Sequence, residues 1–244
     1  SESMFFLLAL TALWGARRRH WSVAGLAAAG AALTRNVGVL LAVPLAVEAF
    51  LQFRTERLAP SAPVPDPMEP ERGPGWRLFL RLLTSTLPAV ALLGYLWFWE
   101  LLSGDPHAPI HDQTQWERVA SFPIVTLGKA SREAFRWIGI YPGGYHLLDW
   151  LIVMPVLVAC GYALVRFRPT FGLYAWVTLL APLSFIFEGR PFMSLPRIVL
   201  PIFPLYWALA RFGERRGVHE AIVAASAAGL GLMTVLFVTW YYVF

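Results

Sequence analysis

The sequence predicts an all-α fold: a polytopic transmembrane helical bundle of about eight membrane helices. Hydrophobic residues make up 57% of the 244 residues, charged residues make up 14%, and the mean hydropathy is +0.56. A soluble domain is less apolar and carries more charge. Long apolar runs alternate with polar segments, and most of the 20 basic residues lie in every second segment. This bias is typical of a protein with several membrane spans.

The predicted helices correspond to the apolar runs, which cover residues 4–16, 21–33, 37–53, 78–102, 147–165, 170–187, 198–212 and 219–243. A helix needs about 20 residues to cross the hydrocarbon core, and the runs 21–33 and 198–212 are shorter than this. Residues 21–53 are too many for one straight span, so we predict a break at Thr34-Arg35-Asn36. Short helices leave their ends below the membrane surface. Arg35 and Arg197 are therefore expected in a recessed cavity lined by protein.

The orientation follows from the basic residues. The positive-inside rule assigns four segments to the cytoplasm, namely 17–20, the Pro-rich loop 54–77, 166–168 and 211–217. Strict alternation then places 1–3, 34–36, 103–146 and 188–197 on the outer side. Prolines within the runs predict kinked helices; they are Pro44, Pro88, Pro155, Pro182, Pro201 and Pro204.

The long outer loop 103–146 is predicted to contain interfacial helices. Asp112 and Gln115 fit a helix N-cap with its capping-box partner. The apolar residues of one face are Ile124, Leu127, Phe135 and Ile138, flanked by Trp116 and Trp137. Such an amphipathic pattern is typical of helices at a membrane surface. His146 and Asp149 begin the next span and are predicted to be interface residues.

Residues 1–244 are interpreted as a single transmembrane domain. The chain begins on Ser1-Glu2-Ser3 without an initiator Met, and we expect it to be the C-terminal portion of a longer protein that has further N-terminal helices. Scarce Lys and Asn with abundant Ala, Leu, Arg and Pro favour a GC-rich bacterial genome. The predicted location is therefore the bacterial inner membrane.

Several function classes are excluded or disfavoured by composition. Cys160 is the single cysteine, so no disulfide or Cys-based metal site forms within the chain. The net charge of +5 comes from Arg-rich turns and does not indicate nucleic acid. No catalytic triad, P-loop or dinucleotide fingerprint is present. Asp105, His107, His111 and Asp112 could bind a divalent metal, but solvated loop charges explain them better, and no cofactor is predicted.

The first candidate site is the outer turn 188–197. It contains Glu188, Arg190, Ser194 and Arg197, and Pro191 and Pro196 stiffen it. A guanidinium group binds phosphate through a planar fork and stays charged, so the turn is suited to the phosphate or pyrophosphate of a lipid. The alternative is that both arginines snorkel to lipid headgroups.

The second candidate site joins two other polar breaks. Arg35 lies between Thr34 and Asn36, and Glu2 lies beside Ser3. Ionised side chains at membrane depth are costly and usually have a function. Glu2 could position a sugar hydroxyl, or it could simply form a structural ion pair with Arg35. We predict that these breaks converge with the turn at 188–197 on one anionic-lipid site.

The motif order resembles the PIG-V-like mannosyltransferase family of the GT-C membrane glycosyltransferases. The residues that carry the resemblance are Ser1–Phe6, the Arg-rich turn 17–19, Ala32–Gly38 and Phe192–Arg197 followed by an apolar helix. The resemblance implies a GT-C-like bundle and inverting transfer of a sugar from a polyprenyl-phosphate donor to an acceptor hydroxyl. The acceptor would be a lipid, a glycan or a protein. The family's general base lies in the first outer loop, which would precede Ser1, so the catalytic residues of this chain are unknown.

Two other functions remain open at this stage. A transporter or flippase for a lipid-linked sugar would need the same anion-binding residues together with polar groups along a path through the membrane. The predicted spans are almost purely apolar and show no inverted repeat, which disfavours transport. A non-catalytic membrane subunit is the third possibility.

Overall fold

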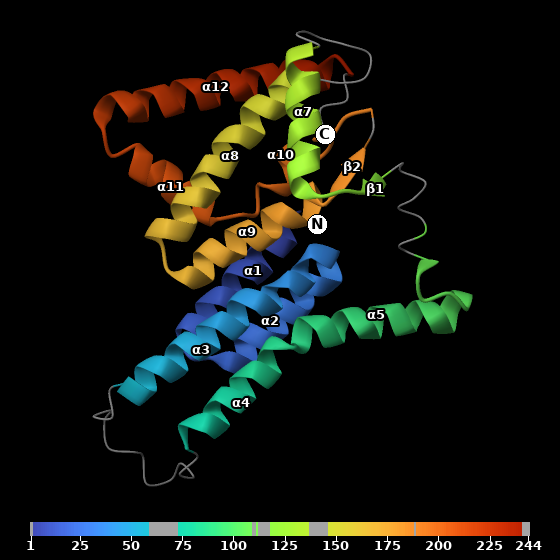
Figure 1. Ribbon diagram of the computed structural model, residues 1–244, viewed down its shortest axis with the longest axis vertical. Coiled ribbons are helices and arrows are strands. Elements are labelled where there is room, and N and C mark those ends of the chain that lie inside the picture. Colours follow the sequence, from blue (N-terminus) through green and yellow to red (C-terminus); the bar gives the residue numbers. More distant parts are fainter. Residues whose placement is uncertain are drawn as a thin grey trace. The chain divides into compact units, whose positions relative to one another are not determined.

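The computed structural model describes residues 2–58, 73–108, 111, 118–136, 146–187 and 189–240. It is about 83% helical, which confirms a predominantly α-helical fold. Within the described residues, four helical segments are long and apolar enough to cross a membrane: Asn36–Leu58, Pro74–Ser103, His146–Arg166 and Arg216–Val238. The total of about eight spans stays a prediction. The chain forms two compact units (Figure 1).

Unit 1 contains Ser1–Ala108 and Pro169–Tyr174. It begins with α1 (Glu2–Arg17) and α2 (Trp21–Thr34), which pack along each other. The buried positions of α2 are all small: Ala24, Gly25, Ala27, Ala28, Ala31 and Ala32. Small residues let membrane helices approach closely. A Cβ on Gly25 would lie 2.4 Å from Cγ2 of Thr84, so this glycine permits the contact between α2 and α4.

The predicted break at Thr34-Arg35-Asn36 is confirmed. Helix α2 ends at Thr34, and Arg35 has an extended backbone with φ −154° and ψ 135°. The chain continues as the 3-10 helix η1 (Asn36–Leu41) and then as α3 (Ala42–Leu58). Gly38 packs directly on α2, because a Cβ there would lie 2.4 Å from the carbonyl carbon of Ala31. Only glycine allows this reversal of the chain without a shift of the backbone.

The loop predicted at 54–77 is shorter than expected. Helix α3 extends to Leu58, and α4 (Pro74–Ser85) begins before the predicted run. The run 78–102 does not form one regular helix, because α4 is followed by α5 (Leu87–Ser103). Thr86 separates the two, and Pro88 near the start of α5 removes a helical hydrogen-bond donor. Figure 1 shows the change of direction between α4 and α5.

Unit 2 contains Pro109–Arg168 and Ala175–Phe244. The segment 103–146, predicted to be an outer loop, includes the predicted amphipathic helix as α7 (Pro123–Arg136), but it also contains a strand that the sequence did not predict. The strands β1 (Arg118–Ala120) and β2 (Phe185–Phe187) pair in antiparallel fashion, with Val119 opposite Ile186. The predicted N-cap at Asp112 and the residues Gln115, Trp116, Trp137 and Ile138 lie outside the described residues.

The remaining helices are α8 (His146–Arg166), α9 (Pro169–Leu183), α10 (Leu195–Ile198), α11 (Pro204–Phe212) and α12 (Arg216–Val238). The predicted span 198–212 is wrong as a single helix, because α10 is followed by turns before Pro204 starts α11. The predicted span 170–187 ends earlier than expected, since α9 stops at Leu183 and strand β2 follows. Turns and short elements thus replace two predicted helical stretches.

Candidate functional site

The turn that follows β2 is built into the core of unit 2. Phe192, Leu195, Val199 and Ile202 are buried there among residues of α8, α9 and α11. Ser194 is also buried, and its backbone is left-handed with φ 63°. A non-glycine residue rarely adopts this conformation, so the surrounding packing must hold it. The turn is therefore a fixed structural feature and not an irregular surface loop.

Arg190 anchors this turn to α8 through Asp149. Its Nε donates to Oδ2 of Asp149 at 2.6 Å, and its Nη2 donates to Oδ1 at 2.8 Å. The two side chains are only 4% and 2% exposed. The bidentate geometry and the burial make this a strong, directional contact. The position of Asp149 at the membrane interface stays a prediction, and within the protein its carboxylate is buried against Arg190.

The predicted phosphate-binding residues of the turn have different environments. Arg190 is buried and bound to Asp149, whereas Arg197 in α10 is exposed. Ser194 is buried immediately before α10, and Glu188 lies outside the described residues. Of the two arginines, Arg197 is the one whose side chain reaches the surface of unit 2.

The second candidate site brings together Glu2 and Arg35 in unit 1. Oε1 of Glu2 lies 3.5 Å from Nη1 of Arg35, and the side chains are 29% and 16% exposed. Thr34 turns its hydroxyl back to the carbonyl of Ala31 at 2.8 Å, while Asn36 and Ser3 are exposed. The predicted ion pair is present, so two of the three polar breaks do meet. The proximity of Arg197 to this pair stays a prediction.

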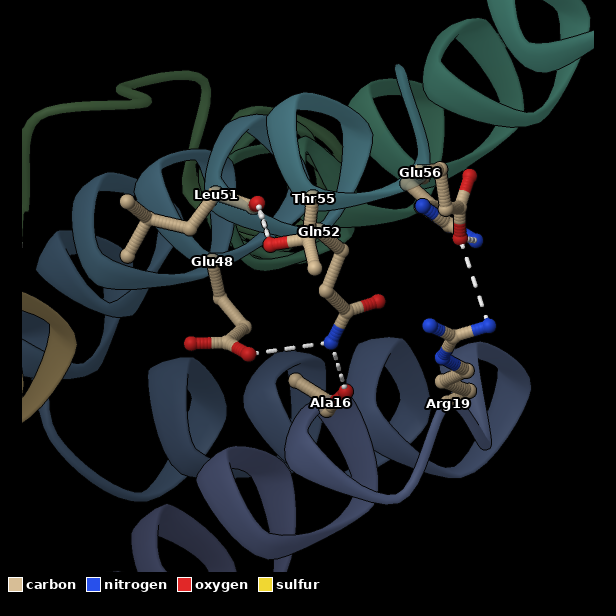
Figure 2. A network of polar contacts seen from close by, with 8 residues as sticks. Ala16, Arg19, Glu48, Leu51, Gln52, Thr55 and Glu56 are labelled. Atoms are coloured by element: carbon tan, nitrogen blue, oxygen red, sulfur yellow. Dashed lines mark hydrogen bonds and ion pairs between the residues drawn. The ribbon is translucent and has the colours of Figure 1, made fainter. Parts of the chain in front are cut away.

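A buried polar group in the middle of the span Asn36–Leu58 was missed by the sequence analysis. Glu48 is fully buried; its Oε1 accepts from Nε2 of Gln52 at 2.9 Å and its Oε2 accepts from the hydroxyl of Thr170 at 2.6 Å. The same amide of Gln52 donates to the carbonyl of Ala16 at 2.8 Å (Figure 2). The prediction of almost purely apolar spans is therefore wrong for α3. Glu48 and Gln52, spaced four residues apart, were the available signal for one polar helix face.

Another group of charged side chains lies beside the C-terminal end of α1, opposite the end that carries Glu2. Glu56 of α3 accepts from Nη2 of Arg81 at 2.7 Å, and Nη1 of Arg19 lies 3.4 Å from the same oxygen. Figure 2 shows Arg19, in the turn after α1, and Glu56, near the end of α3, reaching toward each other. Since the 17–20 turn and the end of α3 meet here, both belong to one end of unit 1, as the predicted topology requires.

The described part of the chain contains no group of three side chains that could together ligate a metal ion. Asp105 instead accepts a hydrogen bond from the backbone N–H of His107 at 2.8 Å. A pocket of about 40 Å³ beside the turn of unit 2 is lined by residues such as Pro182, Phe187 and Met193. This volume accommodates a few water molecules.

Comparison of the chain with protein-family models, with curated proteins and with solved structures finds no match. The fold itself defines the chain as a helical protein with segments able to span a membrane. The resemblance to the PIG-V-like mannosyltransferases stays a prediction that rests on the quoted motifs.

Proposed function

We propose that this protein is a membrane glycosyltransferase that transfers a sugar, predicted to be mannose, from a polyprenyl-phosphate donor to an acceptor hydroxyl. The acceptor is a lipid, a glycan or a protein, and the reaction takes place at the outer face of a bacterial inner membrane. The observation that supports this proposal best is the turn of unit 2, which exposes Arg197 on a buried and rigid base.

Arg197 has the chemistry that the donor requires. Cleavage of a polyprenyl-phosphate sugar leaves negative charge on the lipid phosphate, and a guanidinium group stabilises that charge through a planar pair of donors. Such stabilisation is effective when the cation is already in position and does not need to reorganise. The Asp149–Arg190 pair and the buried side chains of Phe192 and Leu195 support the backbone before Arg197. In this proposal Arg190 is a positioning residue.

Glu2 and Arg35 have a separate role in the proposal. Their 3.5 Å separation and partial exposure leave the Glu2 carboxylate accessible at the end of α1. A carboxylate there can accept a hydrogen bond from a sugar hydroxyl, while Arg35 limits its net charge. Ser3, Thr34 and Asn36 are the neighbouring polar residues that would complete this contact. None of these residues is assigned as the general base.

One observation favours transport of a lipid-linked sugar as a second candidate. The buried group of Glu48, Gln52 and Thr170 lies within a candidate membrane span, where polar residues commonly mark a path. However, Gln52 and Thr170, which donate to Glu48, are themselves buried within unit 1, and the group is consistent with a structural clamp between helices. We therefore rank transport below transfer.

Sugar transfer and transport can be distinguished by reconstituting the complete natural protein into vesicles that contain radiolabelled polyprenyl-phosphate mannose. Transfer predicts a new labelled glycan in the presence of an acceptor extract, and the Arg197→Ala variant should lose it. Movement of the intact donor between leaflets without a labelled product would instead support transport. If neither activity is seen while the protein co-purifies with an active enzyme, the non-catalytic subunit is the better interpretation.

A further inference from the structure

The end of unit 1 that carries the 17–20 turn is strongly basic. Its basic side chains come from three elements, namely the α1–α2 turn, the end of α3 and the start of α4; they are Arg17, Arg18, Arg19, Arg54, Arg57, Arg77 and Arg81. Glu56 is the acidic residue among the described positions of these elements. The segment 59–72, outside the described residues, adds Asp66, Glu69, Glu71 and Arg72 to the sequence, which leaves the charge of this end positive.

One oxygen of the Glu56 carboxylate is already occupied. This oxygen, Oε1, is shared by Arg81 at 2.7 Å and Arg19 at 3.4 Å, and Arg81 is buried. Among the described residues, Nη1 of Arg81 and Nε1 of Trp21 are buried donors without a hydrogen-bond partner, and Oε2 of Glu56 is a buried acceptor without one. The ring of Trp21 lies 6.0 Å from the Arg81 guanidinium. Unpartnered buried donors and an unpartnered buried acceptor therefore both occur at this end, and its positive charge comes from the exposed arginines around them.

Aromatic rings accompany the exposed arginines. The guanidinium of Arg57 lies 4.7 Å from the ring of Phe53, and that of Arg18 lies 6.0 Å from the ring of Trp14. Trp76 and Phe79 at the start of α4 stack on each other and are about half exposed. Rings and basic side chains together are characteristic of the level of lipid headgroups. Helix α4 also exposes apolar side chains, including Leu80 and Leu83. These are suited to the hydrocarbon core of the bilayer beneath the headgroups.

We propose that this basic end is a binding surface for anionic phospholipid headgroups. The proposal does not depend on sugar transfer, because α1 separates this surface from Glu2 by about 22 Å. The contacts would be made by the exposed guanidinium groups of Arg18, Arg54, Arg57 and Arg77. Juxtamembrane arginines each contribute to the attraction of an anionic leaflet. The phosphodiester group of the lipid would bind the arginines. Its acyl chains would contact the exposed apolar residues of α4.

The test uses the complete natural protein purified in a neutral detergent, with lipid binding counted by native mass spectrometry. Dioleoyl phosphatidylglycerol and dioleoyl phosphatidylcholine are compared at equal concentrations. We expect preferential binding of phosphatidylglycerol, and we expect this preference to fall as salt rises. In the variant Arg54→Gln/Arg57→Gln, the affinity for phosphatidylglycerol should fall about fivefold for each charge removed, with little change for phosphatidylcholine.

Two controls make the result specific. Arg54→Lys/Arg57→Lys keeps both charges and should retain the preference. Lys129→Gln/Arg132→Gln removes the same charge from the exposed face of α7 and should leave most of the preference intact. If Arg54→Gln/Arg57→Gln does not fold, Arg18→Gln/Arg77→Gln removes the same charge from the other two elements. The proposal is overturned if the wild type binds both lipids equally, or if the α7 control loses as much preference as the variants of the basic end.

Discussion

The guanidinium of Arg190 and the carboxylate of Asp149, 41 residues apart in the sequence, form a bidentate and almost fully buried ion pair. Removing one partner of such a pair leaves the other charge buried and uncompensated. Asp149→Ala should therefore lower the free energy of unfolding by about 3–5 kcal/mol, measured by denaturant unfolding in micelles. The double replacement Asp149→Leu/Arg190→Leu should recover much of this loss.

The exposed pair of Arg211 and Glu214 is the matched control for that experiment. Its atoms also approach to 2.6 Å, but both side chains are about 60% exposed. Solvent screens such a pair, so Glu214→Ala should leave stability nearly unchanged. Equal losses for Asp149→Ala and Glu214→Ala would contradict the role given to burial.

Gly38→Ala should strongly destabilise the protein. The added Cβ would lie 2.4 Å from both the carbonyl carbon and the oxygen of Ala31, which are backbone atoms that cannot rotate away. Gly94→Ala on α5 is the control, since nothing lies within 4 Å of its Cβ. There the gain in helix propensity, about 1 kcal/mol at most, should raise the melting temperature slightly or leave it unchanged. A harmless Gly38→Ala would show that η1 does not pack on α2 as described.

The hydroxyl of Thr170 should contribute to stability through Glu48. Thr170→Val keeps the shape of the side chain but removes the donor that lies 2.6 Å from Oε2 of Glu48. We expect a loss of about 1–3 kcal/mol, because a buried acceptor loses a partner. Thr234→Val serves as control, since its hydroxyl is exposed and donates only to the carbonyl of Leu230 in its own helix. A loss in the control equal to that in Thr170→Val would rule out a special role for Glu48.

The ion pair of Glu2 and Arg35 distinguishes a structural role from a binding role. A partly exposed pair at 3.5 Å should show a coupling energy for stability below about 1 kcal/mol in a double-mutant cycle. If these residues also contact the polyprenyl-phosphate sugar, Arg35→Ala and Glu2→Ala should reduce the rate of sugar transfer by much more than the small loss of stability explains. Variants that lose stability but retain transfer would restrict the pair to a structural role.

The sequence predicted the features that depend on local chemistry. A polar triplet between two apolar runs was enough to place the break at Arg35, and the charges of Glu2 and Arg35 were enough to suggest their contact. Pro88 and Pro204 were predicted to kink helices, but each lies at the start of one instead. The amphipathic pattern around Leu127 predicted α7 correctly.

The features that were missed depend on contacts between distant residues. The apolar residues at 198–203 favour a helix locally, but packing in the core of unit 2 holds them as turns. The strands β1 and β2 are three residues each, too short for an alternating pattern to reveal them. The partner of Arg190 lies on another helix, and Asp149 was therefore interpreted by its position at the end of a run. A single sequence contains no direct signal of such pairings.

In the proposed reaction, Arg197 stabilises the phosphate of a lipid-linked donor during sugar transfer. The most direct measurement is single-turnover transfer from polyprenyl-phosphate mannose by the complete natural protein, comparing wild type, Arg197→Ala and the exposed control Arg216→Ala. We predict a loss of about 100-fold or more for Arg197→Ala with unchanged melting temperature, and near wild-type transfer for Arg216→Ala. Undiminished transfer by a folded Arg197→Ala protein would contradict the account.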